Sequence, residues 1–389
     1  MANMVAKKVF IRTFGCQMNV RDSEVLCGLL SQKGFSLIKE PEEADIIIFN
    51  TCSVRQHAED RVFSLVGEYK KRRNKGKACS KKAPIVGVIG CMAKNYQESI
   101  FDKSPDVDFV VGPGDIAKIP GVIEKLLNSK KTESFLLQSK IWETDGGARP
   151  EEIYHTGFYE DKKHAYVVIS EGCSNFCSYC VVPYVRGPLR HRFHKDILKE
   201  IEKALEKGLT EITLLGQNVN AYNHEGVNFI ALMERINSIN GLKEFGFMTS
   251  HPKDASLDLF KAIAGFDKLK KSLHLPIQSG SDRILKLMNR GYSRKFYLDL
   301  VDDYRKIVKG GILSTDIIVG FPSESEADFK ETYDLVKDVG FNSAYIFKYS
   351  LRPHTEAMKM QDDVTKSEKE RRHALILELQ RKITKRKRC

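Results

Sequence analysis

Short apolar segments alternate with amphipathic segments along most of the chain, and this alternation is the feature that most constrains the fold. Strands separated by helical patterns need crossover connections, so they pair in parallel and the helices cover the sheet. The first 130 residues therefore predict an α/β domain with a doubly wound parallel sheet. Its expected strands are residues 8–13, 45–49, 85–89 and 109–111, and its expected helices are residues 22–32, 58–71 and 116–127.

A second alternating series follows a polar stretch that contains Gly146, Gly147 and Pro150. Six strand–helix repeats over roughly 190 residues are typical of a barrel or partial barrel, with the chemistry on loops at the carboxyl ends of the strands. We therefore expect a partial (β/α)6 barrel followed by a C-terminal helix. The expected strands are residues 164–169, 211–215, 244–248, 272–275, 313–319 and 343–347, and the expected helices are residues 195–207, 229–239, 257–264, 293–308, 326–338 and 366–387.

The chain has 389 residues, of which 42% are hydrophobic and 29% charged, so it can form a core and is not disordered throughout. No apolar run approaches 18 residues, and no secretory signal is recognisable at the N-terminus, so we expect a cytoplasmic protein without a membrane span. The patterns predict an N-terminal domain over residues 7–128, a linker over 129–158, a barrel domain over 159–360, and a basic C-terminal helix and tail over 361–389.

Lys and Arg exceed Asp and Glu by 63 − 51 = 12, an excess that indicates a polyanionic partner, with nucleic acid the first candidate. Two basic stretches, residues 70–82 and 381–388, can track phosphates, although a charge run can also be a solvated face. We take five side chains as candidates for RNA phosphates: Lys71, Arg72, Arg186, Arg192 and Arg386.

Nine cysteines, an odd number in a large chain without an export signal, favour metal ligands or catalytic thiols over disulfides. Cys173, Cys177 and Cys180 follow the first strand of the second series directly. Three thiolates would leave one iron of an iron–sulfur cluster without a protein ligand, and chemistry can occur at that open position. Structural zinc is the alternative, with His164, His191 or His194 as the fourth ligand.

The C-x3-C-x2-C loop after the first strand of a (β/α) series resembles the radical S-adenosylmethionine (SAM) superfamily. That resemblance implies a 4Fe–4S cluster whose open iron is chelated by SAM. Cys16, Cys52 and Cys91 lie where expected strands of the first domain end, and such ends line one crevice of a doubly wound sheet. We expect them to hold a second cluster, although each alone is more often a core residue.

Nearly the whole chain resembles the methylthiotransferase family of the MiaB type. The family implies methylthiolation at C2 of N6-isopentenyladenosine at position 37 of tRNA, in the anticodon stem-loop. It further implies two 4Fe–4S clusters, SAM, an electron donor and a sulfur donor; we expect a monomer. The resemblance rests on Gly-Cys16-Gln-Met-Asn19, Asp22-Ser-Glu24, residues 52–61, 215–222 and 250–252, and residues 274–281, 320–322 and 349–353.

The resemblance also implies a division of labour. The cluster of the first triad supplies the sulfur, which one SAM methylates, and the second cluster cleaves another SAM to a radical that takes hydrogen from C2.

Uncharged groups at strand ends suit SAM or a base edge, or else stabilise turns; Arg290 can bind the SAM carboxylate, and Tyr179 can shield the cluster. The remaining SAM or substrate candidates are Gln217, Asn218, Asn220, Gln278 and Ser279.

Two features depart from the family pattern. No TRAM domain is recognisable after the C-terminal helix, and we expect the basic tail to compensate. In addition, Leu189 and His191 stand where the family usually has Glu and Ser. Two alternatives therefore stay open. One is a sister enzyme that methylthiolates threonylcarbamoyladenosine in tRNA or a ribosomal protein, and the other is an inert, zinc-stabilised RNA-binding protein.

Overall fold

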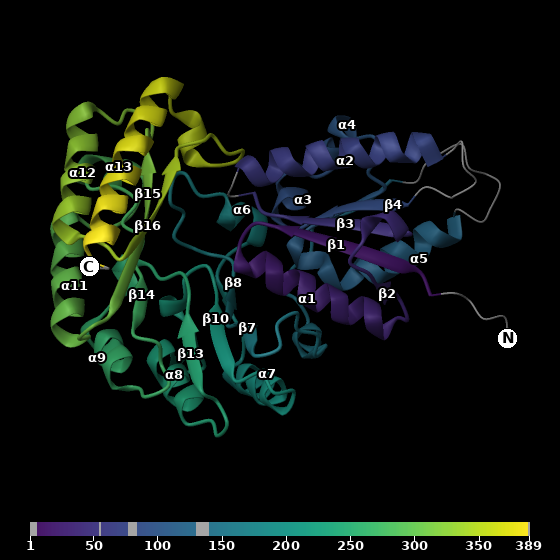
Figure 1. Cartoon of the computed structure of the whole chain (residues 1–389), viewed down its shortest axis with the longest axis horizontal. Coiled ribbons are helices and arrows are strands. Elements are labelled where there is room, and N and C mark those ends of the chain that lie inside the picture. The colour runs from purple at the N-terminus through teal and green to yellow at the C-terminus, as the bar shows by residue number, and fades with distance from the viewer. Residues whose placement is uncertain (1–5, 54–55, 77–83, 130–139, 388–389) are drawn as a thin grey trace. The chain divides into compact units, whose positions relative to one another are not determined.

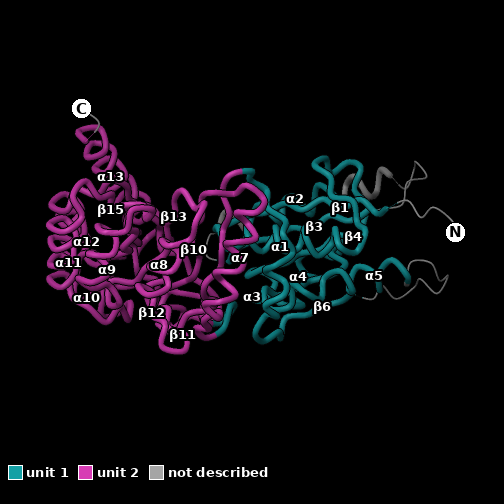
Figure 2. Tube along the Cα trace, turned by 90° about the horizontal axis from the view of Figure 1, so that it is seen from below, with its two compact units in different colours: residues 1–162, 184–187 teal, residues 163–183, 188–389 magenta. Residues whose placement is uncertain are grey.

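The computed structural model describes residues 6–53, 56–76, 84–129 and 140–387. The chain divides into two compact units, coloured separately in Figure 2. Unit 1 comprises Met1–Lys162 together with Tyr184–Gly187, and unit 2 comprises Lys163–Pro183 together with Pro188–Cys389. No helix within the described residues combines the length and apolarity that crossing a membrane requires.

Unit 1 is built on a six-stranded parallel sheet of order β2-β1-β3-β4-β5-β6. Strands β1, β2, β3 and β4 of this sheet are labelled in Figure 1. Strand β3 is buried along its whole length, as its continuous apolar run predicts for a strand covered on both faces. The order reverses between β1 and β3, so the predicted doubly wound sheet is confirmed. The strands are β1 Lys8–Phe14, β2 Ser36–Leu37, β3 Ile46–Thr51, β4 Ile85–Ile89, β5 Phe109–Val111 and β6 Ile141–Glu143; the helices are α1 Gln17–Gln32, α2 Gln56–Gly76, α3 Cys91–Tyr96, α4 Ser99–Lys103 and α5 Ile119–Ser129, with 3-10 turns Pro41–Glu43, Pro113–Lys118 and Glu151–His155.

Three details of unit 1 differ from the sequence-based expectation. Helix α1 begins five residues earlier than expected, at Gln17, directly after its N-cap residue Cys16. The segment expected as a linker contains β6, because its backbone completes the edge of the sheet by pairing with β5. The helix expected from residue 116 begins as a 3-10 turn, and α5 starts only at Ile119.

Unit 2 contains six parallel strands in two groups of three, β7-β10-β13 and β14-β15-β16. A parallel bridge between Phe245 of β13 and Leu269, just before β14, connects the groups. The strands follow in chain order, so the predicted partial (β/α)6 barrel is confirmed. The strands are β7 His164–Val168, β10 Glu211–Leu215, β13 Glu244–Phe247, β14 Ser272–His274, β15 Ile312–Val319 and β16 Ser343–Lys348; the helices are α7 His194–Glu206, α8 Phe229–Asn237, α9 Leu257–Gly265, α10 Asp282–Leu287, α11 Arg294–Ile307, α12 Glu326–Val339 and α13 Lys366–Arg386. Helix α6, Val182–Arg186, begins in unit 2, and its residues from Tyr184 onward belong to unit 1.

Smaller elements occupy the loops of unit 2. Antiparallel pairs join β8 (Ser170–Glu171) to β9 (Arg190–His191) and β11 (Asn223–His224) to β12 (Val227–Asn228). Three-residue and four-residue 3-10 turns lie at Val219–Ala221, Pro252–Asp254 and Glu356–Lys359. Helix α10 was not expected from the sequence, because six residues are too few to show a helical period.

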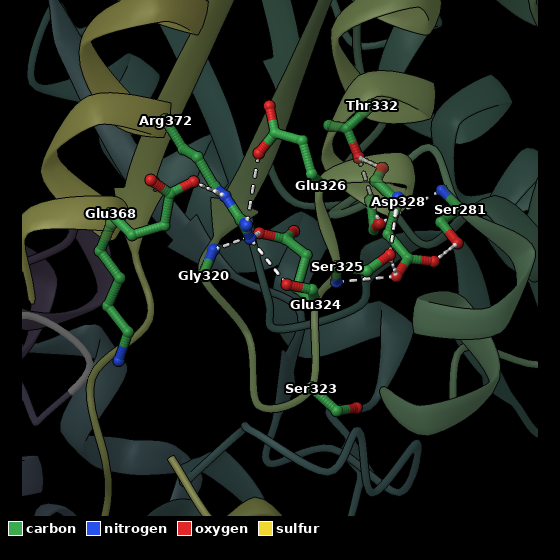
Figure 3. Close-up of polar contacts among 12 residues, drawn as sticks. Ser281, Gly320, Ser323, Glu324, Ser325, Glu326, Asp328, Thr332, Glu368 and Arg372 are labelled. Atoms are coloured by element: carbon green, nitrogen blue, oxygen red, sulfur yellow. Dashed lines mark hydrogen bonds and ion pairs between the residues drawn. The ribbon is translucent and has the colours of Figure 1, made fainter. Parts of the chain in front are cut away.

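The C-terminal helix α13 is tied to the loop after β15 by a buried ion pair (Figure 3). The Arg372 guanidinium donates to Glu324 at 2.7 Å, to the Glu324 carbonyl at 2.8 Å and to Glu368 at 2.6 Å. Glu324 also accepts from the Gly320 backbone N–H at 2.6 Å, just beyond the end of β15. The predicted C-terminal helix is therefore a packed part of the barrel.

Replacing Arg372 by Met should lower the free energy of unfolding by about 3–5 kcal/mol, because Glu324 would stay buried without its charged partner. Burial already raises the pKa of Glu324, and losing Arg372 raises it further. A carboxyl pKa that is higher in the folded state than in the unfolded chain lowers stability as pH rises above the unfolded-state pKa, and the full cost is reached above the folded-state pKa. The deficit should therefore be smaller at pH 4.5 than at pH 8. Denaturant unfolding at both pH values measures this effect.

The neighbouring Arg371 provides the matched control. It pairs with Glu326 and Glu368 at the surface, where ion pairs contribute less than about 1 kcal/mol. Arg371→Met should therefore be nearly neutral at both pH values. Equal effects of the two substitutions would mean that the Arg372–Glu324 pair does not anchor α13.

Candidate metal centres

Cys16, Cys52 and Cys91 come together in unit 1 because they follow three adjacent strands, β1, β3 and β4. The Cys52 N–H donates to the Phe14 carbonyl at 3.0 Å, which joins the ends of β1 and β3. The thiols of Cys16 and Cys52 are hydrogen-bonded, and Cys91 lies near enough to Cys16 to interact with it electrostatically. We call these three residues the first triad.

A pair of buried asparagines fixes the loops that carry the first triad. The Asn19 amide donates to Asn50 Oδ1 at 2.8 Å, and the Asn50 amide donates back to the Asn19 carbonyl at 2.8 Å. Cys16 Sγ lies 3.3 Å from Asn19 Oδ1. The Asn of the Gly-Cys-Gln-Met-Asn segment thus connects the end of β1 with the end of β3.

The surroundings of the first triad favour an anionic sulfur at Cys16. A hydrogen bond from Cys52 lowers its pKa most, burial opposes this, and Arg186 and the backbone N–H groups of Asn19 and Met18 add to the lowering. The resulting pKa is about 6, so this thiol is largely a thiolate at neutral pH. At Cys91 burial dominates and raises the pKa, although Arg186 opposes it. Thiolates are the form that binds metal.

Arg186 lies against the first triad, because the short segment Tyr184–Gly187 belongs to unit 1. Its Nε donates to Cys91 Sγ at 3.2 Å, and Nη2 donates to Asp22 Oδ2 at 2.8 Å. The other Asp22 oxygen accepts from Arg149 at 2.6 Å. Burial alone would raise the pKa of Asp22, but the two arginines outweigh it and lower the pKa. The prediction that Arg186 contacts RNA phosphate is therefore corrected, since its side chain is 3% exposed and holds protein groups.

Gly15 gives a test of the packing at the first triad. A Cβ at Gly15 would lie 2.3 Å from Cys52 Cβ, and its φ of +131° strains any other residue. Gly15→Ala should displace Cys52 and lower the free energy of unfolding by about 3 kcal/mol, since both overpacking and backbone strain contribute. We expect iron uptake by the first triad to fall with it, as iron analysis after reconstitution would report.

Gly34 is the control for backbone strain alone. Its φ is +80°, but a Cβ there would meet no atom within 4 Å. Gly34→Ala should therefore cost only about 1 kcal/mol and leave iron uptake unchanged. If both variants bind iron like the parent, crowding at Cys52 has no influence on the first triad.

Cys173, Cys177 and Cys180, the second triad, lie on the loop that follows β8 in unit 2. Cys180 N–H donates to the Cys177 carbonyl at 2.9 Å, which makes the loop a tight turn. Ser178 fastens the turn, since its N–H donates to the Met288 carbonyl and its hydroxyl to the Leu287 carbonyl. Cys173 and Cys177 are buried and Cys180 is half-buried.

Burial dominates the electrostatics of the second triad. It raises the pKa of Cys173, and it raises the pKa of Cys180 to about 12, with Cys177 adding to the rise. A buried thiolate is unfavourable without a nearby cation or metal, and a coordinated thiol is deprotonated outright. These residues therefore fit an iron–sulfur cluster, whose irons the three thiolates would hold.

Arg290 lies at the second triad. Its Nη1 donates to Cys177 Sγ and to the Tyr179 hydroxyl, both at 3.3 Å. Its Nε donates to the Tyr292 hydroxyl and Nη2 to the Pro276 carbonyl, each at 2.8 Å. The structure thus brings together two predicted residues, Arg290 and Tyr179, with the cysteine loop.

Several other predicted site residues hydrogen-bond within the protein. The Asn218 amide donates to Asp254 at 2.7 Å, and Asn220 exchanges two hydrogen bonds with the backbone of His251. Ser279 contacts the Thr332 hydroxyl at 3.3 Å. These contacts match the turn-stabilising alternative for the three residues. Gln278 is buried with φ +74°, and its backbone bridges to Ile317, whereas Gln217 is half-buried.

The residues predicted to contact RNA phosphates differ in how exposed their side chains are. Arg192 is buried and donates to Glu200 at 2.6 Å, so the prediction of a phosphate contact is corrected there too. Arg386 is exposed at the end of α13. Lys71 and Arg72 lie in α2, but their side chains are outside the described residues, as are residues 77–82 of the same basic stretch.

The zinc alternative required a histidine beside the second triad. His164 contacts the Thr213 hydroxyl at 2.8 Å, His191 packs edge-on against Tyr222, and His194 packs against Phe193. Among the described residues, no three His, Cys, Asp or Glu side chains are grouped around one point as a single ion such as zinc would require.

Sequence reasoning missed Arg149, Tyr292 and Asn50 as neighbours of the triads. Asn50 directly precedes the Thr-Cys pair at the end of β3, and Tyr292 follows Arg290 by two residues, so local spacing could have indicated both. Arg149 gave no such signal, because it lies in the polar stretch expected as a linker.

Fold and triads together define the class: a parallel α/β unit carrying three strand-end cysteines, with a radical SAM barrel. Residues 167–336 match the radical SAM superfamily, and residues 8–112 match the uncharacterized protein family UPF0004. The chain belongs to the family of tRNA-2-methylthio-N(6)-dimethylallyladenosine synthases. It is 44% identical over 386 residues to the protein of that name from Clostridium botulinum (strain Okra / Type B1), covering 97% of this chain and 82% of that protein. The Moorella thermoacetica protein is 40% identical over 385 residues, covering 97% and 84%.

Solved structures share the fold at low sequence identity. The radical SAM methyltransferase TsrM from Kitasatospora setae superposes with a TM-score of 0.60 at 12% identity, covering 91% of this chain and 74% of that chain. The cobalamin-dependent radical SAM enzyme OxsB gives a TM-score of 0.56 at 12% identity, covering 96% and 56%. These similarities establish the fold of the chain.

Proposed function

We propose that this chain is a tRNA methylthiotransferase that converts N6-isopentenyladenosine at position 37 into its 2-methylthio derivative. The observation that carries the proposal is the pair of cysteine triads, one at the ends of three adjacent strands and one on the loop after β8. The identity of more than 40% to synthases of that name supports the substrate.

The second triad would hold the cluster that binds SAM. When bound and reduced, that cluster supplies the one-electron cleavage of SAM to a 5′-deoxyadenosyl radical. The chain contributes burial: Cys173 and Cys177 are each 9% exposed, and Tyr179 packs beside the core of Ile284, Met288 and Phe321. Excluding water in this way protects a radical from side reactions.

The first triad would hold a second 4Fe–4S cluster, the source of the sulfur that is transferred. The chain's own contribution is a set of fixed loops, because Asn19 and Asn50 lock the ends of β1 and β3 together. The low pKa of Cys16 keeps one sulfur in the metal-binding form at neutral pH. Three cysteines that only filled the core would need neither the fixed loops nor the lowered pKa of Cys16.

The proposal also names partners and a location. The tRNA anticodon stem-loop and SAM are the substrates, and a one-electron donor and a sulfur donor must serve the clusters. We expect the exposed basic end of α13, with Arg386, to contact tRNA phosphates. A tRNA substrate places the enzyme in the cytoplasm, and we expect it to act as a monomer.

Nucleoside mass spectrometry tests the function. The reconstituted chain would be incubated anaerobically with SAM, dithionite and tRNA that carries either isopentenyladenosine or threonylcarbamoyladenosine. We expect the 2-methylthio product from the isopentenyl tRNA alone. Product from the other tRNA would identify a sister enzyme. If the enzyme carried its iron–sulfur clusters and formed neither product, the proposal would be wrong.

A further inference from the structure

One buried arginine lies against each cysteine triad. Arg186 Nε is 3.2 Å from Cys91 Sγ in unit 1, and Arg290 Nη1 is 3.3 Å from Cys177 Sγ in unit 2. Both arginines are at least nine-tenths buried. They reach their sulfurs from different local structures, α6 and the loop after α10, so the two contacts are independent observations.

Arg186 lies between a buried carboxylate and the first triad. Arg149 and Arg186 are both buried, and each forms an ion pair with one oxygen of the buried Asp22 carboxylate. A buried charge is unfavourable unless an opposite charge lies near it. Arg186 donates both to Asp22 and to Cys91 Sγ, so its positive charge lies directly against a sulfur of the first triad.

Arg290 shows the same relation to the second triad. Its oxygen partners are the Pro276 carbonyl and the hydroxyls of Tyr179 and Tyr292, which carry no formal charge. Among these contacts, the Cys177 sulfur is the atom that can be anionic.

We propose that Arg186 and Arg290 are positioning residues that each give one thiolate of their own triad a hydrogen bond and a positive charge, and thereby raise the reduction potential of the cluster bound there. The inference rests on the proposed function, which supplies the clusters. Adding an electron makes the cluster sulfurs more negative, so a cationic donor stabilises the reduced state more than the oxidised state. The donor also fixes the orientation of the cysteine.

The test measures midpoint potentials in proteins that hold a single cluster. Replacing the second triad by Ala leaves the first cluster for Arg186 variants, and replacing the first triad leaves the second cluster for Arg290 variants. The clusters are reconstituted anaerobically and titrated with dithionite while electron paramagnetic resonance reports the reduced form. Potential is independent of turnover, so the readout does not rely on activity.

We expect Arg186→Gln and Arg290→Gln to lower the midpoint potentials so that the ratio of reduced to oxidised cluster at a fixed potential falls at least tenfold, about 59 mV for one electron. Arg→Lys should restore most of the shift, because it keeps the charge. Arg186→Gln leaves the Asp22–Arg149 pair intact and should fold. Arg192→Gln, which removes a buried arginine paired with Glu200, should leave both potentials unchanged.

The outcomes separate this inference from the function it rests on. A parent chain that takes up no iron would overturn the proposed function. Clusters that form normally in the Gln variants with the parent potentials would overturn the inference alone. A Gln variant could fold but bind no iron. In that case, iron binding by the corresponding Lys variant would support the role of the positive charge, and a loss of iron binding in both variants would contradict that role.

Discussion

Replacing Cys177 with Ala is expected to abolish methylthiolation, with a loss of at least about 1000-fold in turnover, because the radical chemistry depends on the second cluster. The reconstituted parent should contain about eight irons per chain, and the variant about four, since the first triad is untouched. SAM cleavage should disappear together with the tRNA product. Iron analysis, chromatography of 5′-deoxyadenosine and nucleoside mass spectrometry report the three quantities.

Cys27 is the matched control for Cys177. It is half-buried within α1, away from the carboxyl end of β1, and burial raises its pKa to about 12, so it behaves as a small apolar side chain. Cys27→Ala should retain about eight irons and the parental rate. Iron loss in this variant would mean that Cys27 belongs to a cluster, and full activity in Cys177→Ala would remove the basis of the proposed function.

The sequence predicts the framework of both sites, because the framework follows from local periodicity. Apolar segments such as residues 46–51 and 85–89 have the length and composition of buried parallel strands, and the cysteines that follow them, Cys52 and Cys91, are visible in the sequence itself. Parallel strands meet at one edge of a sheet, so strand-end placement is enough to bring Cys16, Cys52 and Cys91 together.

The groups that surround the cysteines could not be predicted in the same way. Asp22 lies 127 residues from Arg149 and 164 residues from Arg186, and no local pattern encodes pairs at that distance. The sequence therefore predicts a phosphate ligand at Arg186, because a surface arginine and a buried one cannot be distinguished by residue type. The segment 182–187 is six residues long, and tertiary packing decides that its last residues join unit 1.

Replacing Cys91 with Ala should separate the two halves of the reaction. The variant should keep about four irons, all at the second triad, and should still cleave SAM to 5′-deoxyadenosine when dithionite reduces it. It should form no 2-methylthio product, because the first triad is the proposed source of sulfur and Arg186 would lose its contact with the Cys91 sulfur. The same three measurements therefore give a different pattern from that of Cys177→Ala.

The comparison between the two variants is sharper than either alone. If both cysteines served one shared centre, both substitutions would remove iron, SAM cleavage and product together. If the first triad were only packed core, Cys91→Ala would keep all the irons and the product, at a cost in stability of about 1 kcal/mol. Retained SAM cleavage with lost product is the pattern expected only when the two triads hold separate clusters with separate tasks.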